Sequence, residues 1–117
     1  SSNLASKFAA LPYVSSQQTI TSGGLLTLAH GLGVVPSAFA CRLKCVTAEH
    51  NWTVGDEMLA ELSPSGSTAI NSLWSDATNV YVRYSNAANC FNGANKTTGA
   101  ATTLTNANWR LIVRAYP

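Results

Sequence analysis

Charged side chains are scarce in this chain, where they make up 10% of 117 residues and about 25% is typical of globular proteins. Serine, threonine and asparagine replace them, with 13, 12 and 10 copies. A disordered chain would carry more charge and fewer branched and aromatic residues, whereas hydrophobic residues here reach 46%. The composition and length therefore indicate one folded domain with an uncharged polar surface.

Long apolar runs and clusters of one charge are also missing. No run approaches the roughly 18 residues that a membrane helix needs, and no secretory leader opens the sequence, so we expect no membrane insertion. The net charge is only +2, and phosphate binding needs a concentrated basic face, which makes nucleic acid a poor candidate partner. The seven basic residues are scattered along the sequence: Lys7, Arg42, Lys44, Arg83, Lys96, Arg110 and Arg114.

Three cysteines cannot all pair with one another. Cys41 and Cys45 lie four residues apart on what reads as one strand face, about 13 Å apart at roughly 3.3 Å per residue, which excludes a disulfide between them. Cys90 is the one plausible partner for either. We expect three buried thiols made in a reducing compartment.

The best-defined part of the fold lies between residues 25 and 46. Residues 25–30 are apolar and bear threonine, as a strand does, and Gly31 and Gly33 tolerate the positive φ of a sharp corner. Pro36 precedes a second strand, because it cannot donate to a ladder. In that strand Phe39, Cys41, Leu43 and Cys45 alternate with Ala40, Arg42 and Lys44, so one face is predicted to be core.

Other short segments carry the same strand signals. Residues 80–84 and 109–116 alternate strongly, residues 17–21 and 101–104 form weaker strands, and residues 57–62 are expected to pair with residues 68–74 across a type I turn at residues 63–66. Residues 22–24, 75–78, 92–93 and 96–99 have turn chemistry. About eight short strands with almost no helix predict an all-β fold, an antiparallel β-sandwich.

The first residues of the chain differ from the rest. Leu4, Phe8 and Leu11 recur at helical spacing before Pro12, which predicts a short helix over residues 4–10. So short a helix is marginal alone and needs a surface to dock on. We therefore divide the chain into an N-terminal arm or short helix, residues 1–12, and a β-sandwich domain, residues 13–117.

No catalytic motif stands in the sequence. His30 beside Gly31 is interpreted as an orienting or capping side chain, and no serine or cysteine lies in a nucleophile signature. His50 lies near Glu49 and Asp56, which makes a weak metal site conceivable, but no third ligand stands at a recognised spacing. We therefore predict no enzyme activity, no metal and no cofactor.

Ligand contacts are expected in two polar loops, residues 49–56 and 92–99, because loops on a rigid sheet vary without disturbing the core. Flat aromatic side chains can also stack on sugar rings. The candidates are Trp52 in a loop, Trp74 at a strand end, and Tyr81 on the strand face opposite to that of Val80 and Val82. Alternatively, Trp74 and Trp109 cover the core. The candidate ligand-binding residues are Glu49, His50, Trp52, Asp56 and Lys96.

Two segments resemble known proteins. Residues 27–36, TLAHGLGVVP, form a strand followed by His-x-Leu-Gly-x-x-Pro, and residues 104–115, LTNANWRLIVRA, form a closing strand. Both resemble segments of tail-fibre and other virion-surface domains of tailed bacteriophages, and related β-sandwich modules include the H-type lectins. The resemblance implies carbohydrate binding and trimers, although no lectin's sugar-contacting residues map onto this chain one by one.

The sequence therefore predicts a non-enzymatic phage structural module that acts in the virion, after assembly in the bacterial cytoplasm. A tail-fibre or receptor-binding domain that recognises host surface carbohydrate is the leading hypothesis. The alternatives are a capsid or tail decoration protein, whose partners are other virion proteins, and a free-standing carbohydrate-binding lectin. A homo-oligomer is expected because bare sandwich edges with little charge invite association, and the resemblance implies a trimer.

Overall fold

The computed structural model describes residues 11–62 and 69–117, and this part of the chain is all-β, as predicted. It contains ten strands rather than about eight, because two of them are only two residues long. The strands are β1 (Tyr13–Val14), β2 (Gln18–Thr19), β3 (Leu25–Ala29), β4 (Ala38–Cys45), β5 (Glu57–Leu59), β6 (Ser72–Ser75), β7 (Asn79–Arg83), β8 (Phe91–Ala94), β9 (Ala101–Leu104) and β10 (Trp109–Tyr116). A single 3-10 turn, η1 (Asn106–Asn108), precedes β10.

The larger sheet is built around β10. Its strand order is β1-β10-β4-β5, and β2 also pairs with β10. The two long strands pair antiparallel over their whole length, from Trp109 opposite Cys45 to Tyr116 opposite Ala38. Because directly opposed residues point to the same face, the two alternating patterns read from the sequence combine into one apolar surface.

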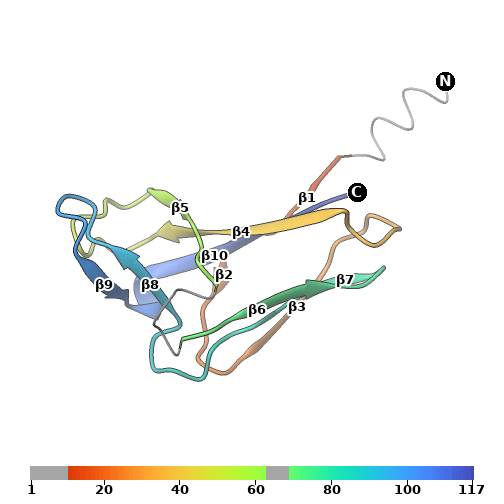
Figure 1. The fold of residues 1–117 in the computed structure, drawn as a ribbon. Helices are drawn as coiled ribbons and strands as arrows, with labels where there is room; N and C mark the ends of the chain where they lie inside the picture. The colour runs from red at the N-terminus through yellow and green to blue at the C-terminus, as the bar shows by residue number, and fades with distance from the viewer. Residues whose placement is uncertain (1–10, 63–68) are drawn as a thin grey trace.

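A smaller sheet covers that surface, so the fold is a β-sandwich. Its order is β3-β7-β6, with antiparallel pairing throughout. Figure 1 shows the two sheets as two layers, with the β8–β9 hairpin at one end. Val80 and Val82 of β7 and the residue that follows the strand, Tyr84, were predicted to share a face, and all three are buried in the core.

The core between the layers is apolar and closely filled. Trp109 and Phe91 are its largest side chains, and both are buried almost completely. Its remaining members come from the two layers, from the β8–β9 hairpin and from residues next to these strands: Ile20, Cys41, Leu43, Cys45, Ala60, Val80, Val82, Tyr84, Cys90, Leu104, Leu111 and Val113. Phe39 shares the inward face of β4 but is 37% exposed, because it lies at the end of the strand.

The glycine corner carries the chain from one layer to the other. Gly31 and Gly33 have φ of 64° and 74°, as predicted, and the segment they form links β3 in the smaller sheet to β4 in the larger one. His30 is buried at its start, where its Nδ1 accepts a 3.1 Å hydrogen bond from the Leu32 N–H. The interpretation of His30 as an orienting side chain is thus confirmed.

One predicted strand pairing is wrong. Strand β5 pairs with β4 in the larger sheet, whereas β6 pairs with β7 across the predicted turn at residues 75–78, where Asp76 accepts hydrogen bonds from the turn's own N–H groups. Beyond these strands, the Asn71 N–H donates to the Leu62 carbonyl at 2.8 Å.

One predicted turn is also wrong. Asn92 and Gly93 lie inside β8, where Gly93 pairs with Thr102. The hairpin turn forms at residues 95–100, which confirms the turn predicted at residues 96–99, and the predicted long loop at residues 92–99 is therefore shorter.

Two expectations concern residues outside the described part of the chain, the helix over residues 4–10 and the type I turn at residues 63–66. Leu11 and Pro12 are described, and both are exposed and precede β1 without regular structure. Across residues 11–62 and 69–117, no helix has the length and apolar character needed to cross a bilayer.

Candidate functional site

Two loops that the sequence singles out meet at one end of the sandwich. One spans residues 46–56 after β4, and the other is the turn of the β8–β9 hairpin, residues 95–100. The Lys96 N–H donates a 3.1 Å hydrogen bond to the His50 carbonyl. The two loops therefore behave as one unit, which we call the loop clasp.

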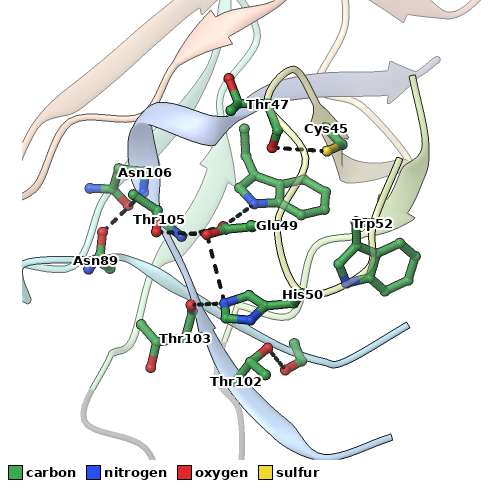
Figure 2. Close-up of polar contacts among 12 residues, drawn as sticks. Cys45, Thr47, Glu49, His50, Trp52, Asn89, Thr102, Thr103, Thr105 and Asn106 are labelled. Atoms are coloured by element: carbon green, nitrogen blue, oxygen red, sulfur yellow. Dashed lines mark hydrogen bonds and ion pairs between the residues drawn. The ribbon is translucent and has the colours of Figure 1, made fainter. Parts of the chain in front are cut away.

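Glu49 points inward from the loop clasp toward the start of β10 (Figure 2). Its Oε1 accepts 2.7 Å hydrogen bonds from the Thr105 N–H and from the indole N–H of Trp109, and its Oε2 accepts a 2.8 Å bond from the Thr105 hydroxyl. Burial raises the pKa of the Glu49 carboxyl, but these hydrogen bonds outweigh burial and leave its pKa below the ordinary value. Glu49 is therefore a fixed anion that holds the loop on the core.

His50 and Asn51 occupy the left-handed backbone region, with φ of 49° and 67°. The His50 Nε2 donates to the Thr103 carbonyl at 3.0 Å and lies 3.7 Å from the Glu49 Oε2. Asn51 Nδ2 donates to Asn95 Oδ1 at 3.1 Å. This sharp bend thus directs both side chains onto the β8–β9 hairpin rather than outward.

Trp52, the residue predicted to contact ligand, is partly buried. Its ring meets Trp109 edge to face, with centroids 6.1 Å apart, and its indole N–H donates to the Ala94 carbonyl at 3.1 Å. The Lys96 ammonium lies 5.8 Å from the ring centroid. Trp109, the Ala94 carbonyl and Lys96 therefore already contact the Trp52 side chain, and less of its ring is open to a sugar.

Asp56 and Lys96 close the loop clasp with an ion pair. The Lys96 Nζ lies 2.6 Å from the Asp56 Oδ2, which also accepts a 2.9 Å hydrogen bond from the Thr53 N–H. The hydrogen bond from Lys96, followed by that from Thr53, holds the pKa of Asp56 below its usual range. Both side chains are partly exposed, so this pair fastens the loops but contributes little to global stability.

The fold thus brings all five candidate residues together and gives each an internal partner. No group of three histidine, cysteine or acidic side chains that could hold a metal ion occurs in the part of the chain that the structure describes. The loop clasp thus consists of two loops held together by hydrogen bonds and an ion pair between their own polar groups. Its residues are Glu49, His50, Trp52, Asp56 and Lys96.

A second candidate lies on the outer face of the smaller sheet. Trp74 on β6 is directly opposite Tyr81 on β7, and the two rings stack with centroids 5.2 Å apart and 16° between their planes. Trp74 is 40% exposed, so its interpretation as a cover for the core is wrong, whereas that of Trp109 is confirmed. Leu73 takes the inward position opposite Val82, and the next residue along a strand must face outward.

The turn beside this aromatic pair fixes its position. The Asp76 Oδ1 accepts hydrogen bonds from the Thr78 and Asn79 N–H groups, at 2.8 and 2.7 Å, and its Oδ2 accepts a 2.7 Å bond from the Tyr81 hydroxyl. The bond from Asn79, followed by that from Tyr81, holds the pKa of Asp76 below its usual range. Tyr81 is therefore tethered, while the indole N–H of Trp74 meets no acceptor in the described part of the chain.

The cysteines and His30 offer no reactive group. Cys41, Cys45 and Cys90 are free and buried, which confirms the prediction of unpaired buried thiols. Burial raises the pKa of all three, that of Cys41 to about 11, so they stay protonated near neutral pH. The remaining ring nitrogen of His30 donates to the Asp76 carbonyl at 2.9 Å.

The sequence ranked the loop clasp above the aromatic pair because a loop position implies exposure. The signal that would have reversed this order is the strand register, since Trp74 and Tyr81 are both outward residues and become neighbours only when β6 pairs with β7. Comparison with known proteins adds no relative, because no protein-family model, curated protein or solved structure matches the chain.

Proposed function

We propose that this chain is a non-enzymatic recognition domain of a bacteriophage virion, part of a tail fibre or receptor-binding protein, and that it holds a host surface sugar on the Trp74–Tyr81 pair. The observation that carries the sugar-binding proposal is the stacking of the exposed Trp74 on the half-buried Tyr81, on a sheet of paired strands. The phage assignment rests on the resemblance of residues 27–36 and 104–115 to virion-surface domains.

The aromatic pair has the properties that a sugar platform needs. An aromatic face offers apolar area to the C–H side of a sugar ring, and an indole N–H adds a hydrogen-bond donor at its edge. Tyr81 is tethered to Asp76, so ordering its ring on binding costs little conformational entropy. The pair therefore suits a ligand with an apolar face and hydroxyl groups around its rim.

The surrounding chemistry supports binding rather than catalysis. Both imidazole rings donate to backbone carbonyls, and the carboxylates of Glu49, Asp56 and Asp76 are each occupied by hydrogen-bond donors. A general base needs a free lone pair within reach of its substrate. These groups hold the fold together instead.

A glycan array tests the sugar proposal, followed by titration of the best glycan with variants. Trp74→Ala is expected to weaken binding by about tenfold or more, as loss of a central aromatic contact does, while Tyr81→Phe keeps the ring and loses only the tether. Leu59→Ala is the control, because Leu59 is 74% exposed on β5 of the other sheet and lies outside the surface proposed below for self-assembly. Equal affinity of Trp74→Ala and Leu59→Ala would contradict the assignment.

We also propose that the domain assembles with itself, as a trimer by the same resemblance. Large apolar side chains are exposed where β4 begins and β10 ends, which supports a covered surface there. The same observation favours the alternative of a capsid or tail decoration protein. Imaging of labelled domain on virions separates fibre from capsid, independently of the glycan array. The exposed side chains are Leu11, Val14, Val34, Val35, Phe39 and Tyr116.

A further inference from the structure

The outer face of the larger sheet gathers most of the positive charge of the chain. Arg42 and Lys44 occupy outward positions of β4, and Arg110 and Arg114 occupy outward positions of β10. Lys44 is directly opposite Arg110. The sequence-based expectation of scattered charge is therefore wrong in three dimensions, because the pairing of β4 with β10 joins residues that are far apart in the chain. We call these four residues the cationic face.

Carboxylates form no salt bridge with the cationic face in the described part of the chain, although Glu57 partly offsets the charge of Lys44. Glu57 lies opposite Lys44 on the edge strand β5, and Glu61 follows two residues beyond that strand. In the described part of the chain neither forms an ion pair with any of the four cations.

Two features of the cationic face are unfavourable in the free protein. The Arg114 Nε is buried and has no hydrogen-bond partner in the described chain, and a buried donor without an acceptor costs free energy. Lys44 and Arg110 face each other, and like charges directly opposite destabilise a sheet. An anion bound beside Lys44 and Arg110 would relieve the repulsion between them, and local costs of this kind are expected at functional positions.

The cations form two anchor points rather than a continuous track. The Arg110 guanidinium donates to the carbonyls of Ala107 and Trp109, at 3.1 and 2.8 Å, which holds it toward η1 at the end of the sheet where Lys44 is opposite Arg110. Arg114 lies four residues further along β10, about 14 Å away at roughly 3.4 Å per residue. Ile112 lies between them and is buried. Charged groups of a matching ligand are thus separated by an uncharged stretch.

We propose that the cationic face binds an acidic glycan through its phosphate or carboxylate groups. Arginine forks bind both kinds of group in a bidentate manner, and a polymer in which acidic units alternate with neutral sugars fits separated anchor points. A nucleic acid fits less well, since it carries a phosphate on every unit and its bases stack on aromatic side chains, whereas Ile112 occupies the middle of this face. The inference goes beyond the aromatic pair, because it concerns the opposite layer.

Binding of purified protein to hyaluronate, in which carboxylates alternate with neutral sugars, to phosphomannan, to neutral dextran and to a DNA oligonucleotide, at several salt concentrations, tests the proposal. We expect one or both acidic glycans to bind and dextran not to bind. The double variant Arg42→Gln/Arg114→Gln should weaken that binding by about tenfold or more, because charge-assisted hydrogen bonds are lost. Arg83→Gln is the control, because it makes the same substitution at one arginine on the outer face of the other sheet.

The outcomes separate clearly. Binding to hyaluronate identifies carboxylate recognition, and binding to phosphomannan identifies phosphate recognition. Either supports the proposal when Arg83→Gln stays within about twofold of the unmodified protein. No binding to either acidic glycan, tighter binding to DNA at equal salt, or equal losses in the double variant and Arg83→Gln would overturn it. So would dissociation of an oligomer by the double variant, which would make this face a contact between subunits. Trp74→Ala should leave this binding unchanged.

Discussion

Glu49 is predicted to be the most important carboxylate for the stability of the fold. In Glu49→Ala the indole N–H of Trp109, a residue buried completely, loses its acceptor. An unsatisfied buried donor costs about 1–3 kcal/mol, and the two bonds from Thr105 to a charged acceptor add roughly 2 kcal/mol more, since Thr105 is exposed and rehydrates. We therefore expect a loss of about 3–5 kcal/mol from the free energy of unfolding.

That loss is large against the roughly 5–15 kcal/mol that stabilises a typical domain. For a chain of this size it corresponds to a fall in Tm of about 12–20 °C. Glu49→Gln keeps the carbonyl oxygen that accepts both N–H groups but removes the charge and replaces Oε2, the acceptor of the Thr105 hydroxyl, with an amide donor. A loss of about 1–2 kcal/mol is therefore expected. Glu57→Gln is the matched control, because this exposed carboxylate makes no hydrogen bond or ion pair in the described part of the chain, and its effect should stay within about 0.5 kcal/mol.

The pH dependence of the free energy of unfolding isolates the contribution of the Glu49 charge. The pKa of Glu49 is lowered in the folded state, so its contribution is present above the ordinary value of 4.5 and is lost as pH falls through the folded pKa. Urea unfolding of the unmodified protein and of Glu49→Gln should give a stability gap that narrows below pH 4.5. Asp56 and Asp76 titrate in both proteins, so their contributions cancel. A gap that stays constant with pH, or a Glu49→Ala protein within about 1 kcal/mol of the unmodified one, would refute the reasoning.

Two further predictions follow from burial and exposure. Cys41, Cys45 and Cys90 should resist a thiol reagent in the native protein near neutral pH and react, all three, in denaturant, because burial raises their pKa; a disulfide detected by mass under non-reducing conditions would contradict this. Light scattering at micromolar concentration should give a mass above the 12.3 kDa of one chain, and deletion of residues 1–12 should weaken the oligomer; a clean monomer would contradict the proposed assembly.

The sequence predicted the core strands well because their alternation is long and unambiguous. In β4 and β10, eight residues each, one face is almost wholly apolar, so the buried face follows from the period alone. The same reasoning placed Val80, Val82 and Tyr84 in the core. The pairing partners of the strands were harder to predict. A turn motif at residues 63–66 indicates that the chain reverses, but it does not indicate which strands pair with each other.

Local turn signals also competed with one another. Asn92-Gly93 has strong hairpin chemistry, but Asn95 and Gly99 lie a few residues further on. The Asn95 Oδ1 accepts hydrogen bonds from two N–H groups of the turn, and Gly99 adopts a φ of 75°. The later pair therefore forms the turn. The sequence named Trp74 and Tyr81 separately as aromatics that can stack on sugar, but it did not show that they are neighbours, and it missed the cationic face. Both need the register between two strands, which composition and spacing do not contain.

The pairing of β1 with β10 determines how the domain responds to mechanical load. Tyr13 lies opposite Ala115 and Val14 opposite Arg114, so polypeptide that enters before β1 and leaves after β10 does so at the same end of the sheet (Figure 1). Tension between those two points peels β1 from β10 one hydrogen bond at a time, and such a strand opens at low force. Tension between the C-terminal end of β10 and a ligand on Trp74 instead pulls across the packed layers, whose side chains would have to separate together. The direction from which an attached ligand pulls would then decide how firmly the domain holds its shape.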